Sequence, residues 1–258
     1  MRLIDEPWKK IFEHYGIMEK HDFDTEPFFI SADEIKKATR EFSETSQREV
    51  RILCKQDARE ERPEIFQLNN LFILPVKNGK YAILRGEGYV DIPQPMKHKS
   101  YRSKIDFELE TSRVGDSEMQ HLDYAYAVSI LRDFMGDPTL VLTIRGRKYT
   151  PEFEFYFGKY GKPIRVQGVQ TEVDAGYEGK DRVVLVEAKN RGLSNVIIRQ
   201  LYYPFRQWSA YTRKKVEVVL FEKSFDQDRY KLWLFEFEEP QRYDSIKLKR
   251  SVAYVLTR

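Results

Sequence analysis

The sequence predicts a mixed fold, α+β or α/β, built as one large or two modest domains. Three observations carry this prediction: helix signals in the first 60 residues, an Asn-Gly turn between two apolar runs, and a later apolar run typical of a buried strand. A chain of 258 residues is long enough to bury a core without disulfides. Hydrophobic residues make up 41% of it, which argues against a disordered chain.

The composition excludes several classes of protein. The single cysteine, Cys54, cannot form an internal disulfide, so nothing implies secretion. One cysteine and four histidines also exclude a zinc-finger fold. The longest apolar runs, such as 71–76, are far shorter than the roughly 20 residues of a membrane-spanning helix. We therefore expect a soluble, cytoplasmic protein with no membrane partner.

Charge is distributed unevenly along the chain. The 44 basic and 41 acidic residues give a net charge of only +3. Residues 189–258 alone hold 15 basic and 8 acidic residues, a net charge of +7. A basic C-terminal third fits a surface that binds a polyanion such as nucleic acid, and it also fits a solvated surface with a modest lysine and arginine excess.

Helix signals recur through the first 60 residues. Ser31 and Glu34 have the spacing of a capping box, in which each side chain accepts a hydrogen bond from the backbone N–H of the other residue. The helix that Ser31 opens is expected to run to about Phe42. Shorter helices are expected over 7–16 and 46–58.

A β-hairpin is expected after these helices. The apolar runs 71–76 and 81–84 enclose Asn78-Gly79, which predicts a tight turn whose two residues both have positive φ. Helices followed by a hairpin resemble a winged helix, a helix-turn-helix variant that contacts DNA. The same order describes many domains that are purely structural, so both interpretations stay open.

A second domain is expected after the prolines in 91–95, because two prolines stop regular structure. The predicted domains are therefore 1–95 and 96–258. Apolar residues at four-residue steps predict a helix over about 117–134. Two strands are expected around Arg145-Gly146-Arg147.

The segment 166–174 is expected to form a further strand. Its alternation puts Gln170, Glu172 and Asp174 on one face, and mostly apolar residues on the other. The turn residues over 175–181 predict a loop after this strand.

An apolar run over 183–186 predicts a central strand that is buried on both faces. The run ends in Glu187-Ala188-Lys189, and a period of two puts the Glu187 and Lys189 side chains on the same face. A hairpin between the two strands brings Asp174 near both. Ionised groups this close to a core are costly unless they are paired or bind a metal.

A hard divalent cation explains the cluster, because such cations prefer oxygen ligands. Asp174, Glu187 and the backbone carbonyl of Ala188 supply three oxygens. Water and a phosphate oxygen complete an octahedron around Mg²⁺, for which Mn²⁺ can substitute. Lys189 then holds or deprotonates the attacking water, or balances the phosphate charge. The structural alternative is a Glu187–Lys189 pair at a frayed strand end, with Asp174 merely starting a turn.

A helix carrying Gln200 is expected to start near Ser194 or Asn195, and Pro204 is expected to kink or end it. Basic residues on and after this helix are expected to form a surface that positions DNA phosphates: Arg199, Arg206, Arg213, Lys214 and Lys215. Two strands are expected to follow, over 216–223 and 230–238.

The order of these motifs resembles the PD-(D/E)xK nuclease superfamily. Val173-Asp174, twelve intervening residues and Glu187-Ala188-Lys189 match its signature, with Val173 where the family name has proline. Asp116-Ser117-Glu118 before a helix and the segment 198–204 are also similar. Within the superfamily, the sequence looks like a type II restriction endonuclease with a winged-helix-like N-terminal domain. The similarity is strongest over about 116–224.

The resemblance implies a mixed central sheet of four or five strands flanked by helices. It also implies Mg²⁺-dependent hydrolysis of double-stranded DNA at a specific short sequence. A homodimer is expected, because a twofold dimer supplies two equivalent sites to a symmetric target. The implied roles are metal ligands for Asp174 and Glu187, catalytic lysine for Lys189, and auxiliary residues for Glu118, Glu172 and Gln200.

Other interpretations stay open. Glu118 fits an ordinary acid favoured by the helix dipole in a first turn, and Glu172 fits a solvent-facing strand residue. The chain as a whole also fits a repair or recombination nuclease of the same superfamily. Two further alternatives are a winged-helix DNA-binding regulator with an inactive nuclease-like domain and a purely structural α+β protein.

Overall fold

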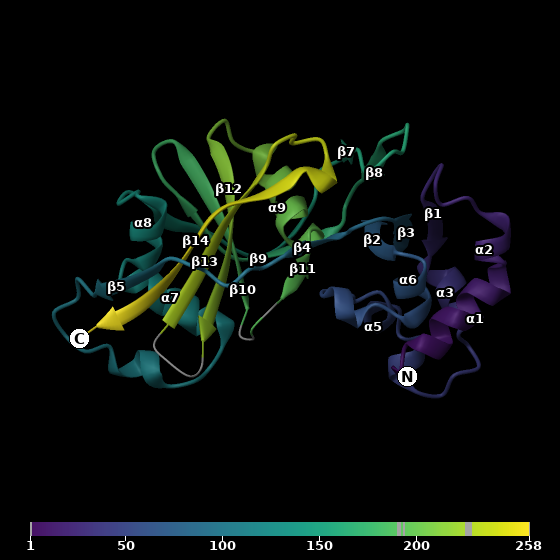
Figure 1. Cartoon of the computed structure of the whole chain (residues 1–258), viewed down its shortest axis with the longest axis horizontal. Helices are drawn as coiled ribbons and strands as arrows, with labels where there is room; N and C mark the ends of the chain where they lie inside the picture. The colour runs from purple at the N-terminus through teal and green to yellow at the C-terminus, as the bar shows by residue number, and fades with distance from the viewer. Residues whose placement is uncertain (1, 190–191, 193, 225–228, 258) are drawn as a thin grey trace.

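The computed structural model describes residues 2–189, 192, 194–224 and 229–257. Figure 1 shows an elongated molecule, with a helical N-terminal part at one end and a large sheet with its helices at the other. Helices and strands both contribute, so the mixed α+β class is confirmed. No helix in the described ranges has the length and hydrophobicity needed to cross a membrane.

The N-terminal part combines short helices with a small antiparallel sheet. Its strands lie in the order β1-β3-β2, and Trp8, Ile11 and Phe66 are fully buried in a core that belongs to this part. Its elements are α1 (Asp5–Tyr15), α2 (Ile17–Lys20), β1 (Phe28–Ser31), α3 (Ala32–Ala38), α4 (Thr45–Arg48), α5 (Val50–Leu53), the 3-10 helix η1 (Arg59–Glu61), α6 (Glu64–Leu68), β2 (Leu71–Lys77) and β3 (Lys80–Arg85).

The capping box expected at Ser31 is present. The Glu34 backbone N–H donates to Ser31 Oγ at 3.2 Å, and the Ser31 N–H donates to Glu34 Oε2 at 2.7 Å. The helix that it opens, α3, ends at Ala38 rather than near Phe42. In place of one helix over 46–58, the short helices α4 and α5 form. These local signals located the start of a helix better than its end.

The expected hairpin is also present. Asn78-Gly79 joins β2 to β3, with Lys77 opposite Lys80. Only Gly79 has a positive φ, of 70°, so the expectation that both turn residues would have one is wrong. The first strand, β1, pairs with the other edge of β3 and completes the small sheet.

Among the described residues, seven strands form one mixed sheet in the order β5-β14-β13-β12-β10-β9-β6. β10 is parallel to β12 and β14 is parallel to β5, while the other neighbours are antiparallel. The sheet has more strands than the four or five that the resemblance implies, because β14 and β5 extend it beyond β13. The strands are β5 (His98–Arg102), β6 (Val141–Tyr149), β9 (Gln170–Glu178), β10 (Arg182–Lys189), β12 (Lys215–Ser224), β13 (Arg229–Phe237) and β14 (Ile246–Thr257); two small pairs are β4 (Tyr89–Asp91) with β11 (Asn195–Ile197), and β7 (Phe153–Phe155) with β8 (Ile164–Val166).

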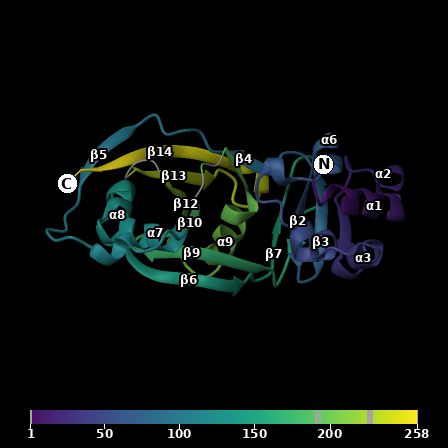
Figure 2. The same cartoon turned by 90° about the horizontal axis from the view of Figure 1, so that it is seen from below.

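Helices cover both faces of the large sheet, as Figure 2 shows. Val183 and Leu185 of β10 pack in the core that includes α9, whereas Val184 and Val186 pack in the core that includes α7 and α8. The prediction of a central strand buried on both faces is therefore confirmed. The helices are α7 (Glu118–Ala127), α8 (Ile130–Met135) and α9 (Arg199–Ser209), and a 3-10 helix η3 (Tyr243–Ser245) precedes β14.

Three local expectations in this part are wrong. The helix over 117–134 is split at Ser129, which has a φ of 68°. Arg145-Gly146-Arg147 lies inside β6, where shifts of register accommodate it. β9 continues to Glu178 instead of giving way to a loop at 175. In both strands, pairing with a neighbour holds residues that have low strand propensity of their own.

The helix that carries Gln200 starts at Arg199, because the residues just before it form β11. Pro204 lies inside this helix, which continues to Ser209, so the proline does not end it. Tyr203 and its neighbours are buried against the sheet. This packing outweighs the backbone hydrogen bond that Pro204 cannot make.

Candidate functional site

The two predicted carboxylates meet at the end of the β9–β10 hairpin. The strands pair antiparallel up to Ala175 opposite Val186, and the next residue outward on each strand carries a carboxylate. The Ala188 backbone N–H donates to Asp174 Oδ2 at 2.7 Å. The register of the hairpin therefore brings Asp174 beside Glu187, as the sequence pattern predicted.

Glu187 and Lys189 form an ion pair on the same face of β10. Lys189 Nζ lies 2.7 Å from Glu187 Oε1. The Lys189 side chain is 21% exposed, and the Glu187 side chain is 13% exposed. Such a pair, largely withdrawn from water, interacts more strongly than a surface pair. Both residues lie within β10, whose last residue is Lys189.

Burial dominates the electrostatics of the cluster. It raises the pKa of Glu187 to about 7, although Lys189 opposes the shift and Asp174 adds to it. Burial also raises the pKa of Asp174, partly offset by the Ala188 N–H and by Lys189. For Lys189, burial acts to lower the pKa, but the Glu187 carboxylate outweighs it and the net direction is upward. An ammonium held in its charged form suits the balancing of phosphate charge.

The donor set fits a hard cation that is only partly enclosed by protein. Within the described ranges, no three His, Cys, Asp or Glu side chains gather in a metal-binding group. Two mutually repelling carboxylates and the Ala188 carbonyl are available instead. Mg²⁺ is usually held by one or two carboxylates, with water and substrate phosphate as the other ligands. The residues therefore suit an open Mg²⁺ or Mn²⁺ site and do not suit a closed cage.

These side chains line a cleft of about 710 Å³ between the sheet and the N-terminal part. The three auxiliary candidates lie in the same cleft. The charges of Glu118 and Glu172 both act on Asp174 to raise its pKa, and Glu172 also pairs with Arg147 at 3.2 Å. Gln200 Oε1 is buried without a hydrogen-bond partner among the described residues. From the sheet side the cleft is lined by Glu118, Tyr149, Gly168, Val169, Gln170, Thr171, Glu172, Asp174, Glu187, Lys189, Arg199, Gln200 and Pro204.

The five predicted DNA-binding residues do not all line the cleft. Arg199 lines the cleft. Lys215 stands opposite Arg182 in the β10–β12 register, seven residues from Lys189, which is about 23 Å along a strand. Lys214 pairs with Glu178 at 2.5 Å at that same far end. The five residues therefore do not all lie beside the carboxylates, and their role in binding DNA stays a prediction.

The other two members of that set also lie apart from the strand ends. Arg206 donates hydrogen bonds to Glu154 O and Tyr202 Oη, each at 2.8 Å, and lies over the Phe153 ring. Arg213 is exposed and immediately precedes Lys214. Arg213, Lys214 and Lys215 are consecutive, so the separation in space is between this group, Arg199 and Arg206.

Cleft residues from the N-terminal part were missed entirely. Arg51, Lys55, Asp57, Lys77 and Tyr81 line the cleft that holds the carboxylates. Nothing in the local sequence distinguishes them, because their place depends on how the two parts pack.

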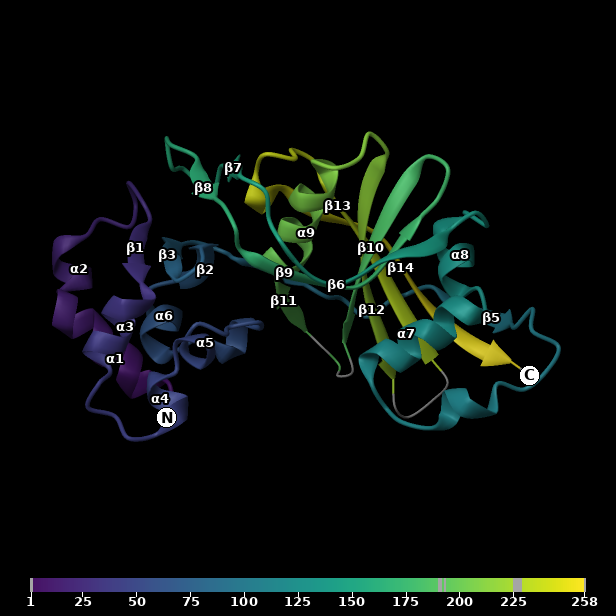
Figure 3. The same cartoon turned by 180° about the vertical axis from the view of Figure 1, so that it is seen from behind.

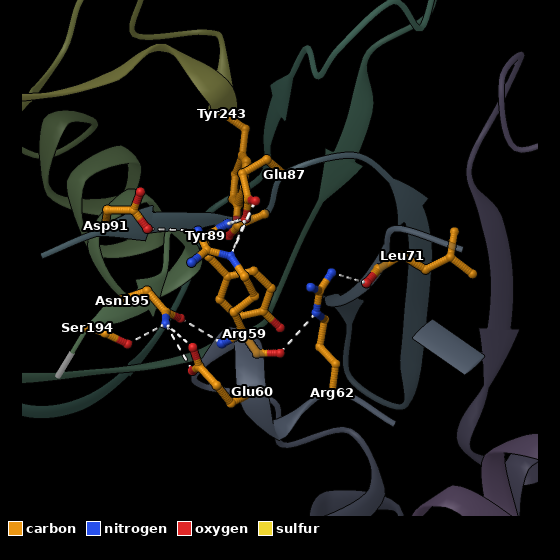
Figure 4. Close-up of polar contacts among 11 residues, drawn as sticks. Arg59, Glu60, Arg62, Leu71, Glu87, Tyr89, Asp91, Ser194, Asn195 and Tyr243 are labelled. Atoms are coloured by element: carbon orange, nitrogen blue, oxygen red, sulfur yellow. Dashed lines mark hydrogen bonds and ion pairs between the residues drawn. The ribbon is translucent and has the colours of Figure 1, made fainter. Parts of the chain in front are cut away.

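A polar joint fixes that packing, and Figure 4 shows it. Asn195 of β11 is 1% exposed, and its Nδ2 donates to both Glu60 carboxylate oxygens at 2.9 Å. Its Oδ1 accepts the Arg59 backbone N–H at 2.6 Å. The Arg59 side chain reaches Asp91 at 3.0 Å and Glu87 at 3.3 Å. The joint thus ties η1 of the N-terminal part to β4 and β11.

Two family models match the chain. One, described as Domain of unknown function (DUF6997), matches residues 84–255. The other, described as Domain of unknown function (DUF6996), matches residues 5–83. No curated protein and no solved structure matches the chain.

Proposed function

This chain belongs to the family described as Domain of unknown function (DUF6997), and we propose that it is a metal-dependent endonuclease that cleaves double-stranded DNA at a specific short sequence, as a homodimer. The observation that carries the proposal is the cluster of Asp174, Glu187 and Lys189 at the ends of two adjacent strands in a cleft. Burying two acids beside a charged lysine costs folding free energy. A site for phosphoryl transfer would explain why the protein has such a cluster.

Each residue has a distinct task in this proposal. Asp174, Glu187 and the Ala188 carbonyl would hold the cation, which when bound would supply positive charge to the scissile phosphate and favour ionisation of water. Lys189 balances the charge that builds up on the phosphate. Gln200, whose buried Oε1 has no partner among the described residues, would accept a hydrogen bond from a water in the small cavity that it lines with Glu172 and Glu187.

Two features of the fold support a PD-(D/E)xK nuclease. A mixed sheet covered by helices on both faces carries the acids at the ends of its middle strands. In the N-terminal part, helices precede a hairpin, and an earlier strand adds to that hairpin in the order β1-β3-β2. This arrangement supports a winged-helix-like module that contacts DNA.

The proposal is tested by incubating the full chain with a long mixed-sequence duplex and Mg²⁺. We expect discrete fragments, and none in excess chelator. Asp174→Asn, Glu187→Gln and Lys189→Met should each lower the cleavage rate by at least about a hundredfold. Full activity of any of these variants would refute the role assigned to that residue. Full activity in chelator would refute the metal-dependent mechanism.

A matched control exists at the other end of the same hairpin. Glu178 of β9 pairs with Lys214, as Glu187 does with Lys189, but far from the cleft. Glu178→Gln should therefore leave cleavage unchanged. A smear of fragments in place of bands would refute sequence specificity, and preference for junctions or flaps would favour a repair or recombination nuclease.

A further inference from the structure

The two walls of the cleft carry opposite charge. The sheet side presents four carboxylates, against the cations Lys189 and Arg199. The N-terminal side presents three cations and only one acid, Asp57. The four carboxylates are Glu118, Glu172, Asp174 and Glu187, and the three cations are Arg51, Lys55 and Lys77.

The cations of the N-terminal wall are available to an anion. Arg51 and Lys77 are exposed, and neither has an ion-pair partner among the described residues. Lys55 makes only a long contact of 3.7 Å with Asp57 and is 69% exposed. By contrast, Lys214 and Lys215 are each paired with a glutamate. The cleft therefore offers positive charge that is free to bind phosphate, whereas the charges of Lys214 and Lys215 are already engaged by glutamates.

The wall is built from two separate segments. Arg51 belongs to α5, and Lys55 follows that helix by two residues. Lys77 is the last residue of β2, next to the Asn78-Gly79 turn, which lines the cleft with it. Figures 1 and 3 show α5 on the side of the N-terminal part that faces the large sheet.

The wall is held at a fixed place relative to the catalytic strand ends. The Ile197 N–H of β11 donates to the Asp57 carbonyl at 2.9 Å, and Arg199 pairs with the Asp57 carboxylate at 3.5 Å. Asp57 lies only two residues after Lys55. A DNA backbone that binds the wall would therefore be presented to the carboxylates at a defined distance.

We propose that Arg51, Lys55 and Lys77 form a phosphate-binding wall that holds the backbone of a DNA duplex across the cleft from Asp174 and Glu187. This inference rests on the proposed nuclease function and names how its substrate is held. Four carboxylates repel a polyanion, so the attraction that seats the duplex comes from the opposite wall.

The test measures binding, so that it does not depend on cleavage. Fluorescence anisotropy of a labelled mixed-sequence duplex is recorded with the full chain in chelator over a series of salt concentrations. The triple variant R51Q/K55Q/K77Q should bind at least about tenfold more weakly at low salt. Its salt slope should fall by about 0.9 for each phosphate that the variant no longer neutralises.

The control removes three charges from the same part of the chain. Lys9, Lys36 and Lys37 are exposed on α1 and α3 and do not line the cleft. The triple variant K9Q/K36Q/K37Q has the same net charge as the cleft triple and should keep the wild-type salt slope. Thermal unfolding of both variants shows whether each remains folded.

Two results would overturn the inference, and only the second would also refute the proposed nuclease function. Equal salt slopes for the two triple variants, together with duplex binding by the wild-type protein, would refute the phosphate-binding wall. The proposed nuclease function would not be affected. Wild-type protein that binds no duplex at any salt concentration would remove both.

Discussion

Asn195→Ala is predicted to loosen the joint between the two parts of the molecule. The substitution removes two hydrogen bonds from Asn195 Nδ2 to the Glu60 carboxylate and one from the Arg59 N–H to Asn195 Oδ1. Asn195 is 1% exposed, so the side chain is removed from a well-packed position. The Arg59 ion pairs with Glu87 and Asp91 remain, as Figure 4 shows, and so does the hydrogen bond from the Ile197 N–H to the Asp57 carbonyl.

The expected cost follows from the kind of bond removed. A hydrogen bond to a charged group contributes about 1.5–3 kcal/mol, and a neutral one about 1 kcal/mol. Because the Glu60 side chain is exposed, water replaces part of what it loses. We therefore expect a loss of about 2–3 kcal/mol in the free energy of unfolding. The N-terminal part is expected to be destabilised more than the large sheet.

The loss should also depend on pH. The Asn195 hydrogen bond is the main reason why the pKa of Glu60 is lowered in the folded chain. A lowered carboxyl pKa gives stability that is present above the unfolded pKa and disappears as the pH falls through the folded one. The difference between wild type and Asn195→Ala should therefore be largest near neutral pH and shrink in acid.

Urea unfolding followed by fluorescence and circular dichroism measures both effects. Two transitions are possible for a chain of two parts, so the two probes are compared before any free energy is extracted. Ser194→Ala serves as the control, since it removes one exposed hydroxyl that accepts from Asn195 at 2.9 Å. A loss below about 0.5 kcal/mol, or equal to that of Ser194→Ala, would refute the joint as a source of rigidity.

Three further predictions use other parts of the chain. Ser31→Ala should cost about 1 kcal/mol, and the cost of Glu34→Gln should vanish in acid, because hydrogen bonds from Ser31 lower the pKa of Glu34; urea unfolding at neutral and acid pH checks both. Gly88→Ala should cost about 1–3 kcal/mol in thermal unfolding, because its Cβ would lie 2.3 Å from the fully buried Phe72 ring, and wild-type stability would show that the ring can move aside. Ca²⁺ should strengthen duplex binding without supporting cleavage, because Asp174 and Glu187 repel phosphate when no cation is bound, and anisotropy that is insensitive to Ca²⁺ would contradict the cation site.

The local features of this protein were predictable from its sequence. The Ser31 cap, the Asn78-Gly79 hairpin and the apolar run of β10 each depend on residues a few positions apart. Their geometry is set by short-range sterics and hydrogen bonding, which a sequence pattern records directly. The spacing from Asp174 to Lys189 belongs with them, because one hairpin is enough to bring those residues together.

The rest was decided by tertiary structure. β14 lies between β13 and β5 and joins them into one sheet, and Pro204 stays within α9 because buried neighbours hold that helix on the sheet. The basic wall of the cleft is distant in the sequence from Asp174 and Glu187. Arg51 and Lys55 precede these carboxylates by more than a hundred residues, and Lys77 precedes them by about a hundred. No spacing in the sequence records such proximity, because it arises from packing and from the Asn195 joint, whose partners are distant in the chain.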